Sequence, residues 1–226
     1  DFKRGLAINT TNLTFSNNTI SKAYTSDIEI LSSNIVLESS QFRANDGGGT
    51  ATVNNIYCVY CSNVTIRDSN ISGSSTQNVY ISANQELTLL NTNHTTHNVQ
   101  AGGRLYKQWY FNALVKDSAG NALSGVLVSF YNNTGALSLS PMTNSSGNII
   151  QQNVTEYYVN GSNDKIYQTN YTINATKIGY SSEARSFNIT TNMNATFATL
   201  SNPVPWTTMN APGNGSNLSR DTSSDK

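Results

Sequence analysis

Two cysteines, two histidines and a few carboxylates are the residues of this 226-residue chain whose spacing could support chemistry. Cys58 and Cys61 read Cys-Val-Tyr-Cys, and the chain has no other cysteine. A redox pair of this spacing needs a helix N-terminus to lower the thiol pKa, but the surrounding sequence is strand-like. A zinc site needs two more ligands, which no paired Cys or His motif supplies. Buried free thiols and a local disulfide both stay open, because residues i and i+3 of an extended strand face opposite ways unless the chain bends.

The histidines and carboxylates give no stronger signal. His94 and His97 read His-Thr-Thr-His without the glutamate of a zinc-protease motif, so we expect them in a surface turn. Carbohydrate-cleaving enzymes need clustered carboxylates, and the N-terminal half offers Asp27, Glu29, Glu38, Asp46, Asp68 and Glu86. Only Glu38 and Asp68 fall at adjacent positions of the repeat described below, with Arg67 beside Asp68. We expect a solvated rim there, with no catalytic residue, no bound metal and no cofactor.

Asn-x-Ser/Thr sequons are the most frequent motif of the chain. They number about twice what the composition alone predicts, which favours a secreted, glycosylated surface protein. The alternative is that Asn and Thr suit the turns of a repeat and create sequons as a by-product. The candidate N-glycosylation sites are Asn9, Asn12, Asn17, Asn63, Asn70, Asn93, Asn132, Asn144, Asn153, Asn160, Asn170, Asn174, Asn188, Asn194, Asn214 and Asn217.

Composition narrows the class of protein. The chain has 13 basic and 13 acidic residues, and only 12% of it is charged, so there is no electrostatic case for binding nucleic acid or an anionic membrane. No apolar run approaches the roughly 18 residues of a membrane span. Hardly any segment has helical periodicity, so we predict an all-β protein. A chain that begins at Asp1 without Met is typical of a mature or truncated product.

A nine-residue pattern that occurs four times dominates the first half. The copies are NLTFSNNTI at 12–20, NIVLESSQF at 34–42, NVTIRDSNI at 63–71 and ELTLLNTNH at 86–94. Most of the intervals are 22 or 23 residues, a period typical of solenoid coils. A single coil has nothing to bury its apolar face against, so stacked neighbours must supply the core. The repeat therefore predicts a short parallel β-helix.

Alternation within each copy predicts which side chains form that core. Successive strand residues face opposite sides, so one inward column contains Phe15, Leu37, Ile66 and Leu89. Short polar residues that favour a turn follow each strand, and the side chains of Ile20, Phe42 and Ile71 then point inward again. His94 replaces this aliphatic or aromatic residue in the fourth copy, which suggests that the column ends there. Further strands are expected at Ile28–Leu31, Ile56–Cys61 and Val79–Ser82, and 45–49 (Asn-Asp-Gly-Gly-Gly) is expected as an extruded turn.

After Gly103 the pattern changes to strands and turns at 8–12-residue spacing, which is typical of a β-sandwich. Leu105–Phe111 is the densest aromatic run, and we expect it to cover the end of the solenoid; an exposed interaction patch is the alternative. The segments VKDSAGNALSGVLVSFYNNTG, TNSSGNI and YTINATKIGYSSEARSFNIT resemble the carboxypeptidase regulatory-like (transthyretin-like, Ig-like) sandwich family over about 112–200. Val126 stands where that family usually has Ala, and 151–168 is a longer, polar insertion.

The resemblance implies a typically non-catalytic sandwich, and a β-helix followed by such a sandwich is similar to archaeal cell-surface proteins. We therefore expect three regions: β-helix coils over 1–105, the sandwich over 106–200, and a Pro-, Gly-, Ser- and Asn-rich tail over 201–226. The tail is expected either to dock along its own domain or to pack against neighbouring copies. The residues expected to make assembly contacts are Phe2, Leu6, Ile8, Trp206 and Met209.

The functional expectation is a non-enzymatic extracellular structural protein, a glycosylated subunit of a cell-surface filament, sheath or surface layer. About four coils make a very short solenoid, and its ends expose strand edges that can pair with another copy. We expect a homo-oligomer or polymer with covalent glycans as its partners. The alternative is a carbohydrate-active β-helix enzyme or a glycan-binding adhesin.

Overall fold

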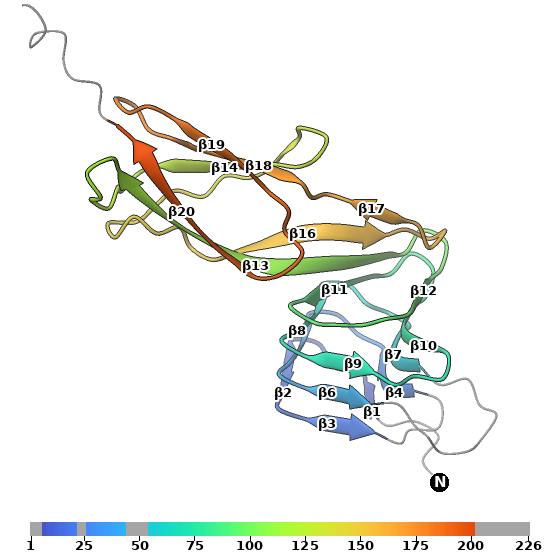
Figure 1. Cartoon of the computed structure of the whole chain (residues 1–226). Helices are drawn as coiled ribbons and strands as arrows, with labels where there is room; N and C mark the ends of the chain where they lie inside the picture. Colours follow the sequence, from blue (N-terminus) through green and yellow to red (C-terminus); the bar gives the residue numbers. More distant parts are fainter. Residues whose placement is uncertain (1–5, 22–25, 44–53, 202–226) are drawn as a thin grey trace, which may run out of the picture.

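The computed structural model describes residues 6–21, 26–43 and 54–201, and the regular structure of these ranges is entirely β-strand (Figure 1). The predicted all-β class is confirmed. The predictions for Phe2, the 45–49 turn with Asp46, and the tail with Trp206, Met209, Asn214 and Asn217 lie outside the described residues.

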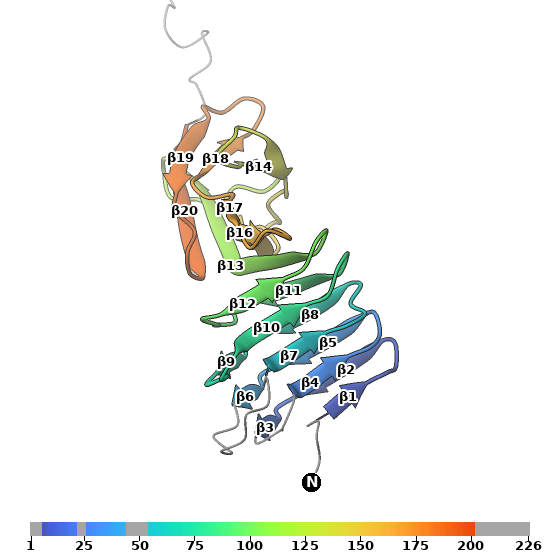
Figure 2. The same cartoon turned by 90° about the vertical axis from the view of Figure 1, so that its right-hand side faces the viewer.

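Three parallel sheets form the N-terminal part, which we call the coil stack (Figure 2). Sheet I contains β1 (Leu6–Ile8), β4 (Ser26–Ile30), β7 (Asn54–Cys58), β10 (Gln77–Ile81) and β12 (His97–Val99). Sheet II begins with β2 (Leu13–Ser16), β5 (Ile35–Glu38), β8 (Val64–Arg67) and β11 (Glu86–Leu90). Sheet III contains β3 (Thr19–Ser21), β6 (Gln41–Arg43) and β9 (Asn70–Ser72).

The register of sheet II joins the residues that the four sequence copies align. Phe15 pairs with Leu37, Leu37 with Ile66, and Ile66 with Leu89. Leu37, Ile66 and Leu89 are fully buried, and they belong to one core that runs through the coils. The apolar column therefore follows from the alternation in sequence, because each coil buries the inner side chains of its neighbour.

The turns on either side of sheet II explain why the repeat begins and ends with short polar residues. Backbone φ is positive at both corners, a conformation that Asn and Asp adopt far more readily than other non-glycine residues. The residues are Asn12, Asn34 and Asn63 before the strands, and Asn17, Ser39, Asp68 and Asn91 after them, with φ between 45° and 58°. The short polar residues at the start and end of the repeat thus correspond to two stacked rows of turns with positive φ.

Buried hydroxyls continue the stacking at the second corner. The Ser40 backbone N–H donates to Ser69 Oγ at 3.0 Å, and the Ser69 N–H donates to Thr92 Oγ1 at 3.2 Å. All three residues are buried, and each hydroxyl also donates to a main-chain carbonyl. This row satisfies backbone groups that would otherwise be unpaired in the core.

A single long strand, β13 (Arg104–Asp117), joins the coil stack to the rest of the molecule (Figure 1). Its first part pairs in parallel with β11 and, on its other side, antiparallel with β16 (Gln152–Val159). From Phe111 onward it pairs in parallel with β20 (Met193–Leu200). The expected boundary between 105 and 106 therefore falls inside one continuous strand, and sheet II extends through both parts of the chain.

The C-terminal unit, residues 111–201, is a two-layer arrangement built on that strand. Its second layer is a four-stranded sheet in the order β15 (Leu137–Leu139), β14 (Leu127–Tyr131), β18 (Tyr171–Thr176) and β19 (Glu183–Phe187). The two layers share a core in which Phe111, Phe130 and Phe197 are fully buried. Two side chains of β19 join the layers by hydrogen bonds to the backbone of β20. Arg185 Nη1 donates to the Thr196 carbonyl at 2.7 Å, and the Ala198 N–H donates to Glu183 Oε2 at 2.9 Å.

Candidate functional site

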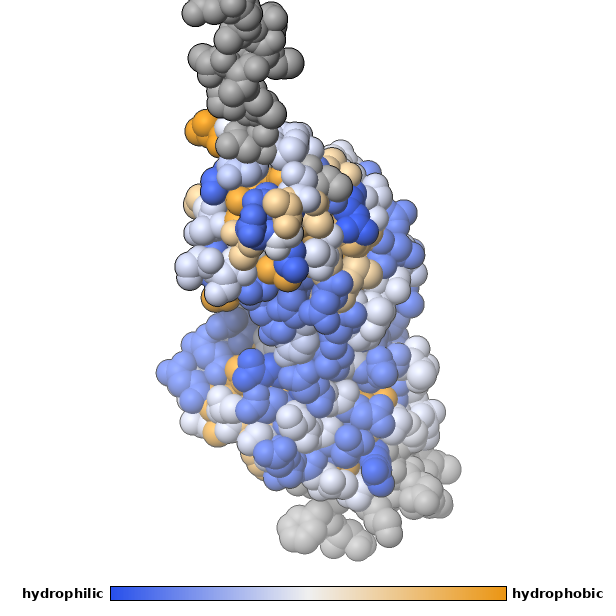
Figure 3. All heavy atoms as spheres, turned by 60° about the vertical axis from the view of Figure 1, so that its left-hand side comes forward, coloured by the Kyte–Doolittle hydropathy of each residue, from blue (hydrophilic) through white to orange (hydrophobic). Residues whose placement is uncertain are grey.

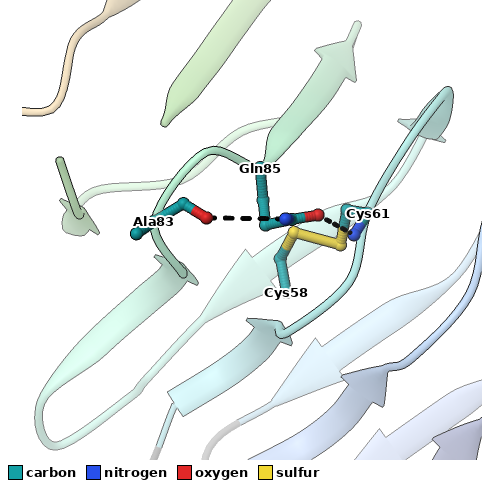
Figure 4. Close-up of a disulfide and its surroundings, with 4 residues drawn as sticks. All are labelled: Cys58, Cys61, Ala83 and Gln85. Carbon is teal, nitrogen blue, oxygen red and sulfur yellow. Dashed lines mark hydrogen bonds between the residues drawn. A yellow bond between two sulfur atoms is a disulfide. The ribbon is translucent and has the colours of Figure 1, made fainter. Parts of the chain in front are cut away.

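The cysteine pair forms a disulfide inside the coil stack (Figure 4). The chain bends directly after β7, where the N–H groups of Val59 and Tyr60 both donate to the Ile30 carbonyl. This bend brings the two Cα atoms to 5.7 Å, and both cysteines are buried in the core. The Cys61 N–H donates to the side-chain oxygen of Gln85 at 2.7 Å. The pair therefore closes a corner of the third coil and is shielded from solvent.

The histidines differ from the expected surface turn. His97 begins β12, and His94 is half-buried, with its Nε2 3.3 Å from His97 Nδ1. Asn70 bridges to Asn93, so His94 follows Ile71 in the inward column of the next coil. Its Nδ1 is buried and has no hydrogen-bond partner among the described residues. Burial, with the charges of His97, Lys107 and Lys165, lowers the pKa of His94 to about 3; burial also lowers the pKa of His97.

The carboxylates that could have suited an enzyme are engaged with other side chains. Glu38 pairs in register with Arg67, whose Nε donates to Glu38 Oε2 at 2.7 Å, and this hydrogen bond raises the pKa of Arg67. Asp68 accepts from Asn91 Nδ2 at 2.7 Å and from the Tyr110 hydroxyl at 2.8 Å. Glu38 and Asp68 thus belong to a polar network on the outer face of sheet II, which also ties the coil stack to β13.

In β13 the position that continues the apolar column of sheet II is occupied by a lysine, Lys107. Lys107 pairs with Leu89 and is buried. Its ammonium group donates to the Thr92 carbonyl and lies 4.0 Å from the centre of the Trp109 ring. The indole N–H of Trp109 donates to Glu156 Oε2 at 2.7 Å. Burial lowers the pKa of Lys107 to about 8. The apolar column of sheet II therefore ends at this ammonium group.

The segment 151–168 closes this end of the coil stack. We expected only a polar insertion, but it forms a hairpin of β16 and β17 (Lys165–Tyr167). Val159 of β16 is fully buried in the coil core and lies opposite Leu105. In the hairpin turn, Asn163 Oδ1 accepts the Val99 N–H of β12 at 2.8 Å. The hairpin thereby contacts β12, the last strand of sheet I, and pairs with β13 beside the last coil strand of sheet II. We call this end of the coil stack the closed end.

The first coil is covered much less by the described residues. Its core-facing side chains Leu6, Leu13, Phe15 and Ile20 are only half-buried, although they pack against the same core. In the described part of the chain, β1, β2 and β3 are the last strands of their sheets, and no strand pairs with their outer edges. We call this the open end.

Expected contact and modification residues fall into two groups. Leu6 is half-buried at the open end, whereas Ile8 is 3% exposed and packs in the core, so its side chain is not available to another copy. The described sequon asparagines that are exposed are Asn9, Asn12, Asn17, Asn63, Asn70, Asn93, Asn144, Asn153, Asn170, Asn188 and Asn194. Three are half-buried: Asn132, Asn160 and Asn174.

Sequence reasoning missed the residues that build the closed end. Lys107 could have been found by aligning Leu105-x-Lys107 with Leu87-x-Leu89, because the two segments pair residue by residue. The roles of Tyr110 and Asn163 could not, since their partners Asp68 and Val99 are 42 and 64 residues away and only the fold brings them together.

Comparison with known proteins does not assign the chain: no protein-family model matches it, and no curated protein matches it significantly. Over the described ranges, no helix is long and apolar enough to cross a membrane. Nor do three or more His, Cys, Asp or Glu side chains gather within those ranges as they would around a metal ion.

Proposed function

We propose that this chain is a non-enzymatic, glycosylated structural subunit of an archaeal-type cell surface. In this proposal a short parallel β-helix is followed by a transthyretin-like sandwich, and copies assemble into a filament, sheath or surface layer through β-edge contacts at the open end. The observation that carries the proposal is the difference between the two ends of the coil stack. One end is covered by a hairpin and a two-layer unit, while the other presents strand edges and half-buried apolar side chains.

Physical chemistry favours pairing at such an end. Unpaired N–H and C=O groups on an edge strand are a template for another chain, and an added strand gains main-chain hydrogen bonds. Complete burial of an apolar side chain contributes roughly 1.5–3 kcal/mol relative to full exposure, and Leu13, Phe15 and Ile20 have reached only part of that burial. A neighbouring copy that covers them supplies the next rung of the same core.

Exposed sequons support an extracellular location. Eleven of the fourteen described candidates are exposed, and on the coil stack they lie at the corners of sheet II or on sheet III, not on the strands of sheets I and II. Three of them, Asn9, Asn12 and Asn17, lie on the first coil beside β1 and β2, so the proposal requires glycans there to point away from the strand edges.

Static light scattering of the full chain over a concentration series tests the proposal, with a deletion of residues 203–226 as the second sample. We expect the mass to rise with concentration and native material to show filaments or a lattice by electron microscopy. A monomer at every concentration would contradict assembly through the open end, and an unchanged mass after the deletion would show that residues 203–226 take no part in it.

A glycan-binding module or carbohydrate-active enzyme is the second candidate, and one observation favours binding. Tyr57 and Tyr80 lie side by side on neighbouring strands, with ring centres 5.1 Å apart, and Tyr60 nearby is 63% exposed. Exposed aromatic rings give sugars an apolar surface to stack on. Screening against uronic-acid polysaccharides, with Tyr60→Ser for binding and Asp68→Ala for turnover, separates the candidates. Turnover that Asp68→Ala abolishes would overturn the structural proposal.

A further inference from the structure

A shallow apolar groove lies on the four-stranded sheet of the C-terminal unit, far from the open end. It has a volume of about 510 Å³, and its lining includes Leu127, Met142, Ile178 and Tyr180. Leu127 is 38% exposed, Met142 61% and Ile178 101%. In Figure 3 several apolar residues lie on the visible face of the C-terminal unit, whereas the visible surface of the coil stack is mostly hydrophilic. Three large apolar side chains around one hollow indicate a surface that something covers.

The chain leaves the described region at the rim of this groove. Ser201 follows β20, and its carbonyl accepts the Ser181 N–H at 2.9 Å, while its own N–H donates to Ser181 Oγ at 2.9 Å. The next residue, Ser182, lines the groove. Two hydrogen bonds therefore hold Ser201, the last described residue, against Ser181, the neighbour of Ser182 in the groove wall.

The first residues beyond that point are the most apolar part of the tail. They read Asn202-Pro203-Val204-Pro205-Trp206, and the remaining twenty residues are mostly polar. Two prolines restrict φ to about −65° and favour an extended polyproline conformation, which loses little entropy on binding and is recognised by aromatic-lined grooves. Tyr180 supplies an aromatic ring there, with Lys177 Nζ 5.3 Å from its centre.

We propose that Pro203–Trp206 docks in this groove of its own chain, with the Trp206 indole against Leu127, Met142 and Ile178. Five residues reach at most about 17 Å from Ser201, which suits a site that begins at the neighbouring Ser182. A tryptophan buries about 150–250 Å² of surface, so it can cover the exposed apolar side chains together. The tether gives the segment a high effective concentration at its own groove, which favours docking within one chain over docking between copies. Trp206 is then not a contact to a neighbour, and residues 207–226 leave from a fixed point.

Tryptophan fluorescence of the full chain tests this docking at low concentration, where copies do not associate. Trp109 is the only other tryptophan, so the difference between wild type and Trp206→Phe isolates the Trp206 signal. We expect that signal to be blue-shifted and at least about twofold less quenched by acrylamide than an exposed indole, because docking buries the ring. Leu127→Glu and Ile178→Glu should shift it to the exposed value.

Leu137→Glu is the matched control: Leu137 is 57% exposed on β15 and does not line the groove. We expect it to leave the Trp206 signal unchanged. All three substituted leucine and isoleucine side chains are exposed, and a urea unfolding curve for each variant verifies that it folds. An exposed Trp206 signal in the wild type, or a buried one that both groove variants leave unchanged, overturns the proposal. A buried signal that disappears on dilution also overturns it, because the segment then docks on another copy. These outcomes do not depend on whether the open end assembles.

Discussion

The open and closed ends of the coil stack are built from the same repeat but have different surroundings. At the closed end, Val159 and Leu105 complete the apolar core, Lys107 ends its column, and the β16–β17 hairpin covers the last strands. At the open end, Leu13 and Phe15 occupy equivalent column positions and stay half-buried.

The difference shows how this coil stack is terminated at one end. The apolar column ends where a lysine takes the place of an aliphatic residue and where an antiparallel strand takes the next position in the sheet. Lys107 provides the charge, and antiparallel β16 provides the strand. Neither device is found beside β1, β2 or β3 in the described residues. Within the described residues, the open end thus presents the outer edges of β1, β2 and β3 without a strand beside them.

The largest expected effect is on the free energy of unfolding, when the same Leu→Ala substitution is made in three different coils of the stack. Leu37→Ala and Leu89→Ala remove fully buried side chains, so we expect each to lower the free energy of unfolding by about 2–5 kcal/mol. Leu13→Ala removes a half-buried side chain and should cost less than half as much in the monomer. Urea unfolding at low protein concentration measures all three. An equal cost for Leu13→Ala would mean that the open end is covered within the chain.

The next effect concerns acid stability at the closed end. Below the unfolded-state pKa of about 6.5 the unfolded chain protonates His94, whereas the folded chain does not until its pKa of about 3. The unfolded state thus binds more protons, so stability should fall as the pH drops from about 6.5 toward 3. At pH 4.5, two units below the unfolded-state pKa, we expect His94 to account for roughly 2.7 kcal/mol of that loss.

His94→Leu provides the test, because it restores an aliphatic residue to the column that holds Ile20, Phe42 and Ile71 in earlier coils. The variant should unfold at higher urea than wild type, and the gap should widen between pH 7.5 and pH 4.5. Parallel curves for the two proteins over that range would show that the imidazole is not shielded by the closed end.

Substitutions in the turn of the β16–β17 hairpin should destabilise the closed end and not the open end. A Cβ on Gly161 would lie 2.8 Å from the Gln100 carbonyl oxygen and from the Gly102 nitrogen, so Gly161→Ala must displace backbone and should cost about 1–3 kcal/mol. Asn163→Ala removes the acceptor for the Val99 N–H and places Ala at a φ of 64°, which Asn adopts more readily, so it should cost about 1–3 kcal/mol. Amide exchange should accelerate at Val99 and not in β4. Equal acceleration at both places would mean that the two ends do not open separately.

The smallest effect concerns the polar contact between the coil stack and β13. Tyr110→Phe removes the hydroxyl that donates to Asp68 and should cost about 1 kcal/mol. Burial, together with the hydrogen bond to Asp68, raises the pKa of Tyr110 to about 12. Tyrosine absorbance should therefore show one residue fewer titrating near pH 12 in the variant. If the variant instead loses one residue that titrates near the ordinary tyrosine pKa of about 10, the hydroxyl is exposed.

The coil stack could be predicted from sequence because its determinants are local and repeated. The alternation of Val64, Thr65 and Ile66 and the left-handed corner at Asp68 recur in every copy, and the left-handed corner at Asn63 recurs in the first three. The strands of sheet I begin two residues before the predicted starts, since the buried polar residues Asn55 and Asn78 extend them. A buried asparagine pairing with its equivalent in the next coil is not visible as alternation.

The closed end could be predicted only in part. The aromatic run Leu105–Phe111 lies in β13, whose first residues pair with β11 at the end of the coil stack. The role of 151–168 depends on contacts across about 50 residues that no local pattern encodes. The disulfide stayed undecided for a similar reason. It needs a bend at Val59 and Tyr60 that is set by the Ile30 carbonyl of the coil below.

Sedimentation velocity of the full chain with Phe15→Glu tests the central claim most directly, with Leu137→Glu as the control at an exposed position elsewhere. A charge at Phe15 should block burial of the open end against another copy. We predict concentration-dependent assembly for wild type and Leu137→Glu, and a folded monomer for Phe15→Glu. Assembly of Phe15→Glu to the same extent as wild type would contradict the assignment of the open end as the assembly surface.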